Sequence, residues 1–159
     1  MLDERLQPSL LDRLTDDTPG TITERDASNS INIARLRKII LRDLTWLFNT
    51  SNMEADHDLE VFPNVAQSVL NYGISDLSGS TNTQNRAQEI QQTVRKAIET
   101  FEPRIRRETI EVTMQKQEAG TLISFDIRAE HWAEPVPVDL YLRTALDVTS
   151  GEITVSRQG

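Results

Sequence analysis

Apolar residues in the first two thirds of the chain repeat at the spacing of an amphipathic helix. In residues 30–49 they occur every three or four positions, which places them on one helix face. The same spacing predicts a second long helix over residues 84–101. The residues expected to face the core are Ile33, Leu36, Ile40, Leu44 and Leu47 in the first helix, and Ala87, Ile90, Val94, Ala97 or Ile98, and Phe101 in the second.

A short helix is predicted between these two, over residues 63–72. Pro63 suits the first helical turn, because the N–H group that proline lacks would have no partner there. Gly73 can adopt the left-handed geometry that ends a helix. Three apolar residues of this helix are expected to face inward: Val65, Val69 and Leu70.

After residue 105 the apolar period changes from about 3.6 residues to 2. The alternation predicts strands near residues 110–114, 123–129, 138–148 and 153–155. Each strand is apolar on one face only, which favours an antiparallel sheet with helices on a single side. The predicted fold class is α+β, with N-terminal helices packed on one face of a small antiparallel sheet. The C-terminal hairpin or its neighbour should leave a strand edge unpaired, and such an edge can accept an added strand.

The start of the chain differs from the rest in composition. Residues 1–28 are mostly polar and contain a turn signal, DDTPG, at 16–20. We predict a mobile N-terminal arm over residues 1–28 and a single folded domain over residues 29–159. Leu10, Leu11 and Leu14 have helical spacing on a segment too short to be a stable helix alone. These leucines are expected either to fold back on the domain or to become ordered on a partner.

Charge and composition narrow the classes of partner. The 159 residues carry a net charge of -8 at pH 7, which argues against nucleic acid as the main partner and against docking on an anionic membrane. Arg42 and its basic neighbours nevertheless form a local basic surface on the first long helix. The chain has no cysteine, no secretory signal and no apolar run long enough for membrane insertion. A cytoplasmic location is therefore expected.

The segment that follows the second long helix is a rigid, charged elbow. Pro103 ends the helix, because it lacks an N–H group and disfavours helical geometry in the preceding residue. Glu102 and Arg104 flank this proline, so the backbone fixes the directions of a carboxylate and a guanidinium. Such a pair suits bidentate, charge-assisted recognition of another protein. The alternative interpretation is a helix stop with two solvated charges.

Four phrases occur in order and with consistent spacing: PSLLDRL at 8–14, LRDLTWLFNT at 41–50, SVLNYGISDL at 68–77 and FEPR at 101–104. Together they resemble the TssE family of type VI secretion systems. That family belongs to a wider group of contractile-tail baseplate proteins that are called lysozyme-like in phages. The resemblance extends from about residue 10 to about residue 151.

The resemblance implies a structural protein without catalytic activity, cofactor or bound metal. It implies that Glu102, Pro103, Arg104 and Arg42 bind the wedge proteins TssF, TssG and TssK. It also implies that an edge strand seeds the TssB–TssC sheath, at a baseplate assembled on the inner face of the bacterial inner membrane. A fold-related anti-adaptor that binds a response regulator is the alternative from another functional class.

The word lysozyme-like makes a glycosidase worth considering, since glycoside hydrolysis needs two carboxylates across a sugar cleft. Glu130, beside His131 and Trp132, is the most tempting site, but it precedes a proline-rich loop. The two histidines, His57 and His131, do not have the spacing of a metal site. No nucleophile elbow or phosphate-binding loop occurs in the sequence. The sequence therefore favours a protein that acts by binding other proteins.

Overall fold

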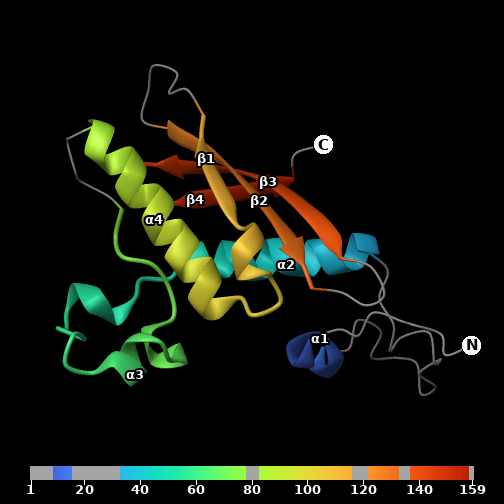
Figure 1. Ribbon diagram of the computed structural model, residues 1–159, viewed down its shortest axis with the longest axis horizontal. Coiled ribbons are helices and arrows are strands. Elements are labelled where there is room, and N and C mark those ends of the chain that lie inside the picture. Colours follow the sequence, from blue (N-terminus) through green and yellow to red (C-terminus); the bar gives the residue numbers. More distant parts are fainter. Residues whose placement is uncertain (1–8, 16–32, 78–82, 116–121, 133–136, 158–159) are drawn as a thin grey trace, which may run out of the picture.

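The structure is a computed structural model that describes residues 9–15, 33–77, 83–115, 122–132 and 137–157. Helices occupy the first part of the described chain and strands the last part (Figure 1). The α-helices are α1 (Leu10–Leu14), α2 (Ile33–Phe48), α3 (Pro63–Ala66) and α4 (Thr83–Phe101). The 3₁₀ helices are η2 (Met53–Ala55), η3 (Val69–Asn71) and η4 (Arg107–Thr109), and the strands are β1 (Glu111–Met114), β2 (Leu122–His131), β3 (Val138–Asp147) and β4 (Ile153–Arg157).

The four strands form one antiparallel sheet in the order β1-β2-β3-β4. Its register pairs Phe125 with Thr144, and Thr144 with Val155. Along β2 and β3 alternate residues are buried, so one face of the sheet carries the core. Helix α2 packs against β4, α4 packs against β1, and the two helices touch each other (Figure 1). The predicted α+β class is confirmed.

The two long helices bury the faces that the periodicity predicts. In α2, Leu36, Ile40, Leu44 and Leu47 are at most 4% exposed. Ile33 was expected in the same stripe but is 47% exposed, and it stands at the first residue of the helix. The buried positions of α4 are Ile90, Val94, Ala97 and Ile98.

The helix predicted over residues 63–72 is wrong in extent and in the residues that it buries. Ser68 interrupts it, because its hydroxyl donates to Val65 O at 2.9 Å and accepts from Leu70 N at 3.2 Å. Val69 and Leu70 are consequently 81% and 66% exposed, and Val65 is half-buried. The buried residue of the segment is Asn71, whose amide accepts from Met53 N at 3.0 Å and donates to Ala66 O at 3.0 Å. An amide, not an apolar stripe, therefore holds this segment together.

The sheet has edges at β1 and β4, and a side-chain amide from a neighbouring segment binds each. Asn49, just after α2, accepts from Ile153 N at 2.9 Å and donates to Ile153 O at 2.8 Å. Gln91 of α4 donates to Val112 O at 3.0 Å. The C-terminal hairpin thus forms one edge of the sheet, as predicted. Asn49 occupies the backbone N–H and C=O groups of Ile153, the first residue of this edge strand.

Most of the predicted N-terminal arm, residues 1–8 and 16–28, lies outside the described residues, so its mobility stays a prediction. The described part of the arm contains α1, which Ser9 caps by accepting from Asp12 N. None of the helices in the described part of the chain combines the length and apolarity of a membrane span.

Replacing Gly73 by alanine should lower the free energy of unfolding by about 3 kcal/mol. Gly73 has a φ of 126°, and a Cβ placed there would lie 2.2 Å from Thr50 O. Gly151→Ala is the matched control, since its φ of 75° falls in the left-handed region and should cost only about 1 kcal/mol. Urea denaturation measures both losses, and equal losses would contradict the close approach at Gly73.

Candidate protein-binding site

The elbow after α4 is held by backbone hydrogen bonds to the end of β2. Helix α4 ends at Phe101, and Ile105 N donates back to Glu102 O at 3.1 Å across the exposed Pro103. Trp132 N then donates to Arg104 O at 2.7 Å. These bonds hold the turn against the sheet, and the rigidity of the elbow stays a prediction.

The carboxylate and the guanidinium of the elbow bind each other. Arg104 Nε donates to Glu102 Oε1 at 2.6 Å, and Arg104 Nη2 donates to Glu102 Oε2, so the pair is bidentate. The backbone N–H of Arg104 also donates to Glu102 Oε1, at 3.2 Å. The Glu102 side chain is only 6% exposed and that of Arg104 is 28% exposed. Glu102 is therefore held inside the fold, and Arg104 is held by the fold but is still partly accessible at the surface.

Asp43 of α2 extends this pair into a network. Its Oδ2 accepts from Arg104 Nη2 at 2.6 Å, and its Oδ1 accepts from Arg42 Nε and Nη2 at 2.9 and 2.7 Å. Arg42 Nη1 then donates to Asp12 Oδ1 of α1 at 2.7 Å. Charges alternate along the chain of contacts, in the order Asp12, Arg42, Asp43, Arg104 and Glu102, which we call the elbow network.

The pKa values reflect this alternation. Burial acts to lower the pKa of Arg104, but the hydrogen bonds with Glu102 and Asp43 outweigh it and hold this pKa above its ordinary value. Burial likewise acts to raise the pKa of Asp12, and the hydrogen bonds from Arg42 and Ser9 lower it by more. Both groups are therefore held in their charged forms.

Aromatic side chains surround the network. The guanidinium of Arg42 lies 4.8 Å from the ring centroid of Trp46, a cation–π distance, and Trp46 is 50% exposed. Tyr72 and Phe101 pack edge to face with centroids 5.5 Å apart. His131, at the end of β2, is 5% exposed, and its two ring nitrogens have no hydrogen-bond partner in the described part of the chain.

Three of the four predicted binding residues meet in this network, namely Glu102, Arg104 and Arg42, and Pro103 lies exposed between the first two. Sequence reasoning missed Asp43, which joins Arg42 to Arg104, and Asp12, which joins Arg42 to α1. Both stand inside the phrases that carry the family resemblance. These phrases place a charged residue among apolar ones. That pattern could have indicated that Asp12 and Asp43 are held at fixed positions by the fold, since a solvated charge does not need apolar neighbours.

Helix α1 contacts the network through a charge, and its leucines remain outside. Leu10, Leu11 and Leu14 are 70%, 47% and 75% exposed, while the Asp12 side chain is 7% exposed. Helix α1 thus contacts its own domain through Asp12, and its leucines are not buried there. That the leucines become ordered on a partner stays a prediction.

The residues considered for catalysis lie apart. Glu130 pairs with Arg106 at 3.4 Å, and the ring of its neighbour His131 is buried. His57 is exposed in the segment after η2, and His131 ends β2. The described residues contain no group of three or more side chains that could hold a metal ion. The network itself is chemically suited to binding, because it presents guanidiniums fixed by carboxylates.

Replacing Arg104 by alanine should lower the free energy of unfolding by about 3 kcal/mol, because the buried Glu102 carboxylate would lose its guanidinium. The double variant Glu102→Ala, Arg104→Ala should lose less, since the buried Glu102 carboxylate is removed together with its guanidinium and Asp43 keeps its pair with Arg42. The exposed pair Arg95–Glu99 is the control, and Arg95→Ala should cost less than about 0.5 kcal/mol. Urea denaturation measures each variant. A double variant less stable than Arg104→Ala would show that the pair is not the dominant interaction.

The stability of the protein should fall as pH drops below the ordinary His131 pKa of 6.5. Burial and the nearby Arg104 lower the pKa of His131 in the folded state, and Glu102 opposes them only in part. The unfolded chain therefore takes up a proton first, so stability is complete above pH 6.5 and is lost as pH falls toward the folded pKa. His131→Leu should remove this slope between pH 6.5 and 5, as measured by melting temperature. The exposed His57, changed to Gln, is the control that should keep it.

Comparison with known proteins identifies a family for this chain. The family model of baseplate wedge protein gp25 matches residues 34–136, which is more than half of the chain. No curated protein matches. A chain of the solved structure "The baseplate complex from the type VI secretion system" matches at 17% identity with a TM-score of 0.46, over 70% of this chain and 94% of that chain. At these values the structural similarity carries no functional conclusion. The family match confirms the resemblance seen in the sequence at the level of the wider family: the chain belongs to the baseplate wedge protein gp25 family.

Proposed function

We propose that this protein is the TssE-type structural wedge component of a type VI secretion baseplate. The family match supports the baseplate role, and the four sequence phrases support the TssE type. The observation that carries the proposal is the elbow network, a rigid group of charges at a turn that also presents an exposed proline.

The elbow network offers a partner two guanidiniums that are already oriented. Arg104 and Arg42 keep 28% and 33% of their side chains exposed. The hydrogen bonds of Arg104 within the described chain use its backbone N–H, Nε and Nη2, and none of them uses Nη1. A carboxylate of a wedge protein can bind there with little loss of side-chain entropy, because the fork is already fixed. TssF, TssG and TssK are the proposed partners at this surface.

The free edge of β4 is the proposed site of sheath seeding. In the register of the hairpin, Ile153 and Val155 point their backbone groups away from β3, because the hydrogen-bonded positions include Glu152 and alternate along the strand. Asn49 occupies the groups of Ile153, and among the described residues no hydrogen bond occupies those of Val155, which leaves them for an added strand. A strand of the TssB–TssC sheath would extend the sheet at this edge.

The proposal includes neither catalysis nor a cofactor. It places the protein in the cytoplasm, in a baseplate at the inner face of the inner membrane. Incubation with peptidoglycan should give no turnover above buffer. Hydrolysis that a single carboxylate-to-amide substitution abolishes would contradict the structural role.

In cells, Glu102→Ala, Arg104→Ala should abolish fluorescent sheath assembly. Removing Arg104 leaves the proposed wedge carboxylate unpaired at the interface, which costs about 2 to 5 kcal/mol of binding, or roughly 30-fold or more in affinity. Glu102 holds that guanidinium in place, so both substitutions act on the same contact. Pro103→Ala should have a milder effect, because both charges remain. Sheath foci are counted by fluorescence microscopy, with protein levels measured alongside.

A control for lost stability is needed, because the same residues stabilise the fold. A variant of the buried Ile98, chosen to match the melting temperature of the double variant, provides it. That core variant should assemble sheaths normally. Normal sheath assembly in the double variant would leave the elbow as a structural turn only, and equal failure of both would show that stability alone was lost.

A further inference from the structure

The segment between α2 and α4 forms an excursion away from the sheet. It contains η2, α3 and η3, and it lies beside the C-terminal half of α4 (Figure 1). Lys96 of α4 pairs with Glu54 of η2 at 3.6 Å, and Asn71 holds the excursion together internally. The elbow network does not include any residue of this segment from Glu54 to Leu70.

The excursion exposes large apolar side chains both before and after α3 in the sequence. Val61 and Phe62 precede the helix and are 69% and 58% exposed. Val69 and Leu70 follow it and are 81% and 66% exposed. The short helices do not depend on apolar contacts at these four positions, because the hydrogen bonds of Asn71 hold the helices together. Four exposed apolar residues within ten positions do not contribute to the core, and they indicate a binding surface.

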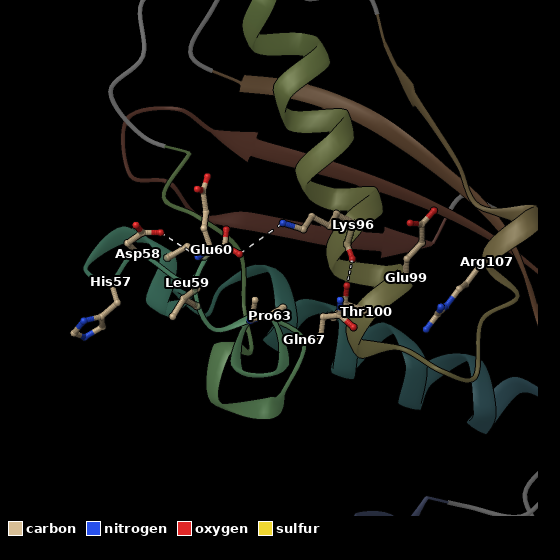
Figure 2. Close-up of a pocket in the computed structure, with 12 residues that line it drawn as sticks. His57, Asp58, Leu59, Glu60, Pro63, Gln67, Lys96, Glu99, Thr100 and Arg107 are labelled. Carbon is tan, nitrogen blue, oxygen red and sulfur yellow. Dashed lines mark hydrogen bonds and ion pairs between the residues drawn. The ribbon is translucent and has the colours of Figure 1, made fainter.

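An acidic groove of about 720 Å³ lies between the excursion and α4. Pro63 and Ala66 of α3 line it, and the exposed Phe62 comes directly before this helix. Figure 2 shows His57, Asp58 and Glu60 on the side of the excursion, and Glu99, Thr100 and Lys96 on the side of α4. Arg107 lies at the end farther from Asp58.

The negative charges of the groove are unevenly paired. Glu54 is bound by Lys96, and Glu99 by Arg95 at 2.7 Å. Asp58 and Glu60 have no ion pair among the described residues. They stand four and two residues before Phe62, so uncompensated negative charge lies next to exposed apolar surface on the excursion.

We propose that the excursion docks a basic amphipathic helix of a partner protein. Its apolar face would cover Phe62 and the neighbouring apolar residues, and its lysines or arginines would pair with Asp58 and Glu60. Exposed apolar residues close in sequence to unpaired carboxylates fit this chemistry, because burial supplies affinity and opposite charge fixes the orientation. The inference goes beyond the proposed function, because it concerns a separate surface and holds whether or not the elbow binds wedge proteins.

The test uses a synthetic leucine–lysine helix of about 18 residues, a length at which an isolated helix begins to form. Amide shifts of the labelled full chain are recorded during titration. The expected shifts fall on residues 57–71 and on the neighbouring part of α4. A leucine–glutamate peptide of the same pattern should leave these signals unchanged, because the carboxylates would repel it.

Two variants separate the apolar and the charged contributions. Phe62→Ser, Leu70→Ser and, separately, Asp58→Asn, Glu60→Gln should each weaken the leucine–lysine peptide about tenfold. Asn at position 58 keeps the acceptor that binds Glu60 N at 3.0 Å, so the local turn is retained. Leu122→Ser is the matched control, since Leu122 is 55% exposed on β2, and it should leave the affinity unchanged.

Three outcomes would overturn the proposal. The first is a set of shifts spread over the whole acidic surface. The second is an affinity that neither double variant changes. The third is concentration-dependent dimerisation in sedimentation that Phe62→Ser, Leu70→Ser removes, because the occupant would then be a second copy of this chain. All variants change exposed side chains, and an unchanged amide spectrum outside the excursion confirms that each is folded.

Discussion

The carboxylate of Asp43 is the point on which the arrangement of this protein depends. One oxygen binds Arg42, its neighbour on α2, and the other binds Arg104, 61 residues later in the chain. Through Arg42 it also reaches Asp12 of α1. A single side chain thus joins α1, α2 and the elbow where α4 gives way to the sheet. Buried ion pairs add little net stability compared with apolar packing, but removing one partner is costly. The main effect of Asp43 is therefore to fix the relative positions of Arg42 and Arg104, and its net contribution to the free energy of folding is small.

The sequence predicted the elements whose identity depends on a repeated apolar spacing. The buried stripes of α2 and α4 and the alternation in β2 and β3 follow directly from the helical and strand periods. The elements it missed depend on single polar side chains. Ser68 ends α3 early and Asn71 replaces an apolar residue at the centre of the excursion. A periodicity does not record such local hydrogen bonds, so Val69 and Leu70 were placed on the wrong side.

The candidate site was predicted in part for the same reason. Pro103 fixes a local geometry, so the importance of Glu102 and Arg104 is readable from three adjacent residues. Their pairing with Asp43 is a contact between distant segments, and no spacing along the chain encodes it. The pairing with Asp43 also changes how the elbow charges are interpreted. They are held by the fold first, and a partner would meet guanidiniums whose orientation is already determined.

The edges and the exposed surfaces follow a common physical logic. Unpaired strand edges invite unwanted strand addition. Here one side-chain amide binds each edge, Asn49 at β4 and Gln91 at β1, and these contacts narrow the backbone left for another chain. The apolar residues outside the core are not scattered evenly over the described chain: several lie on α1 and several on the excursion. A protein that acts through assembly benefits from this combination, because the cap on Ile153 limits strand addition at β4 to the backbone groups that Asn49 leaves, while side-chain surfaces of defined shape and charge discriminate between partners.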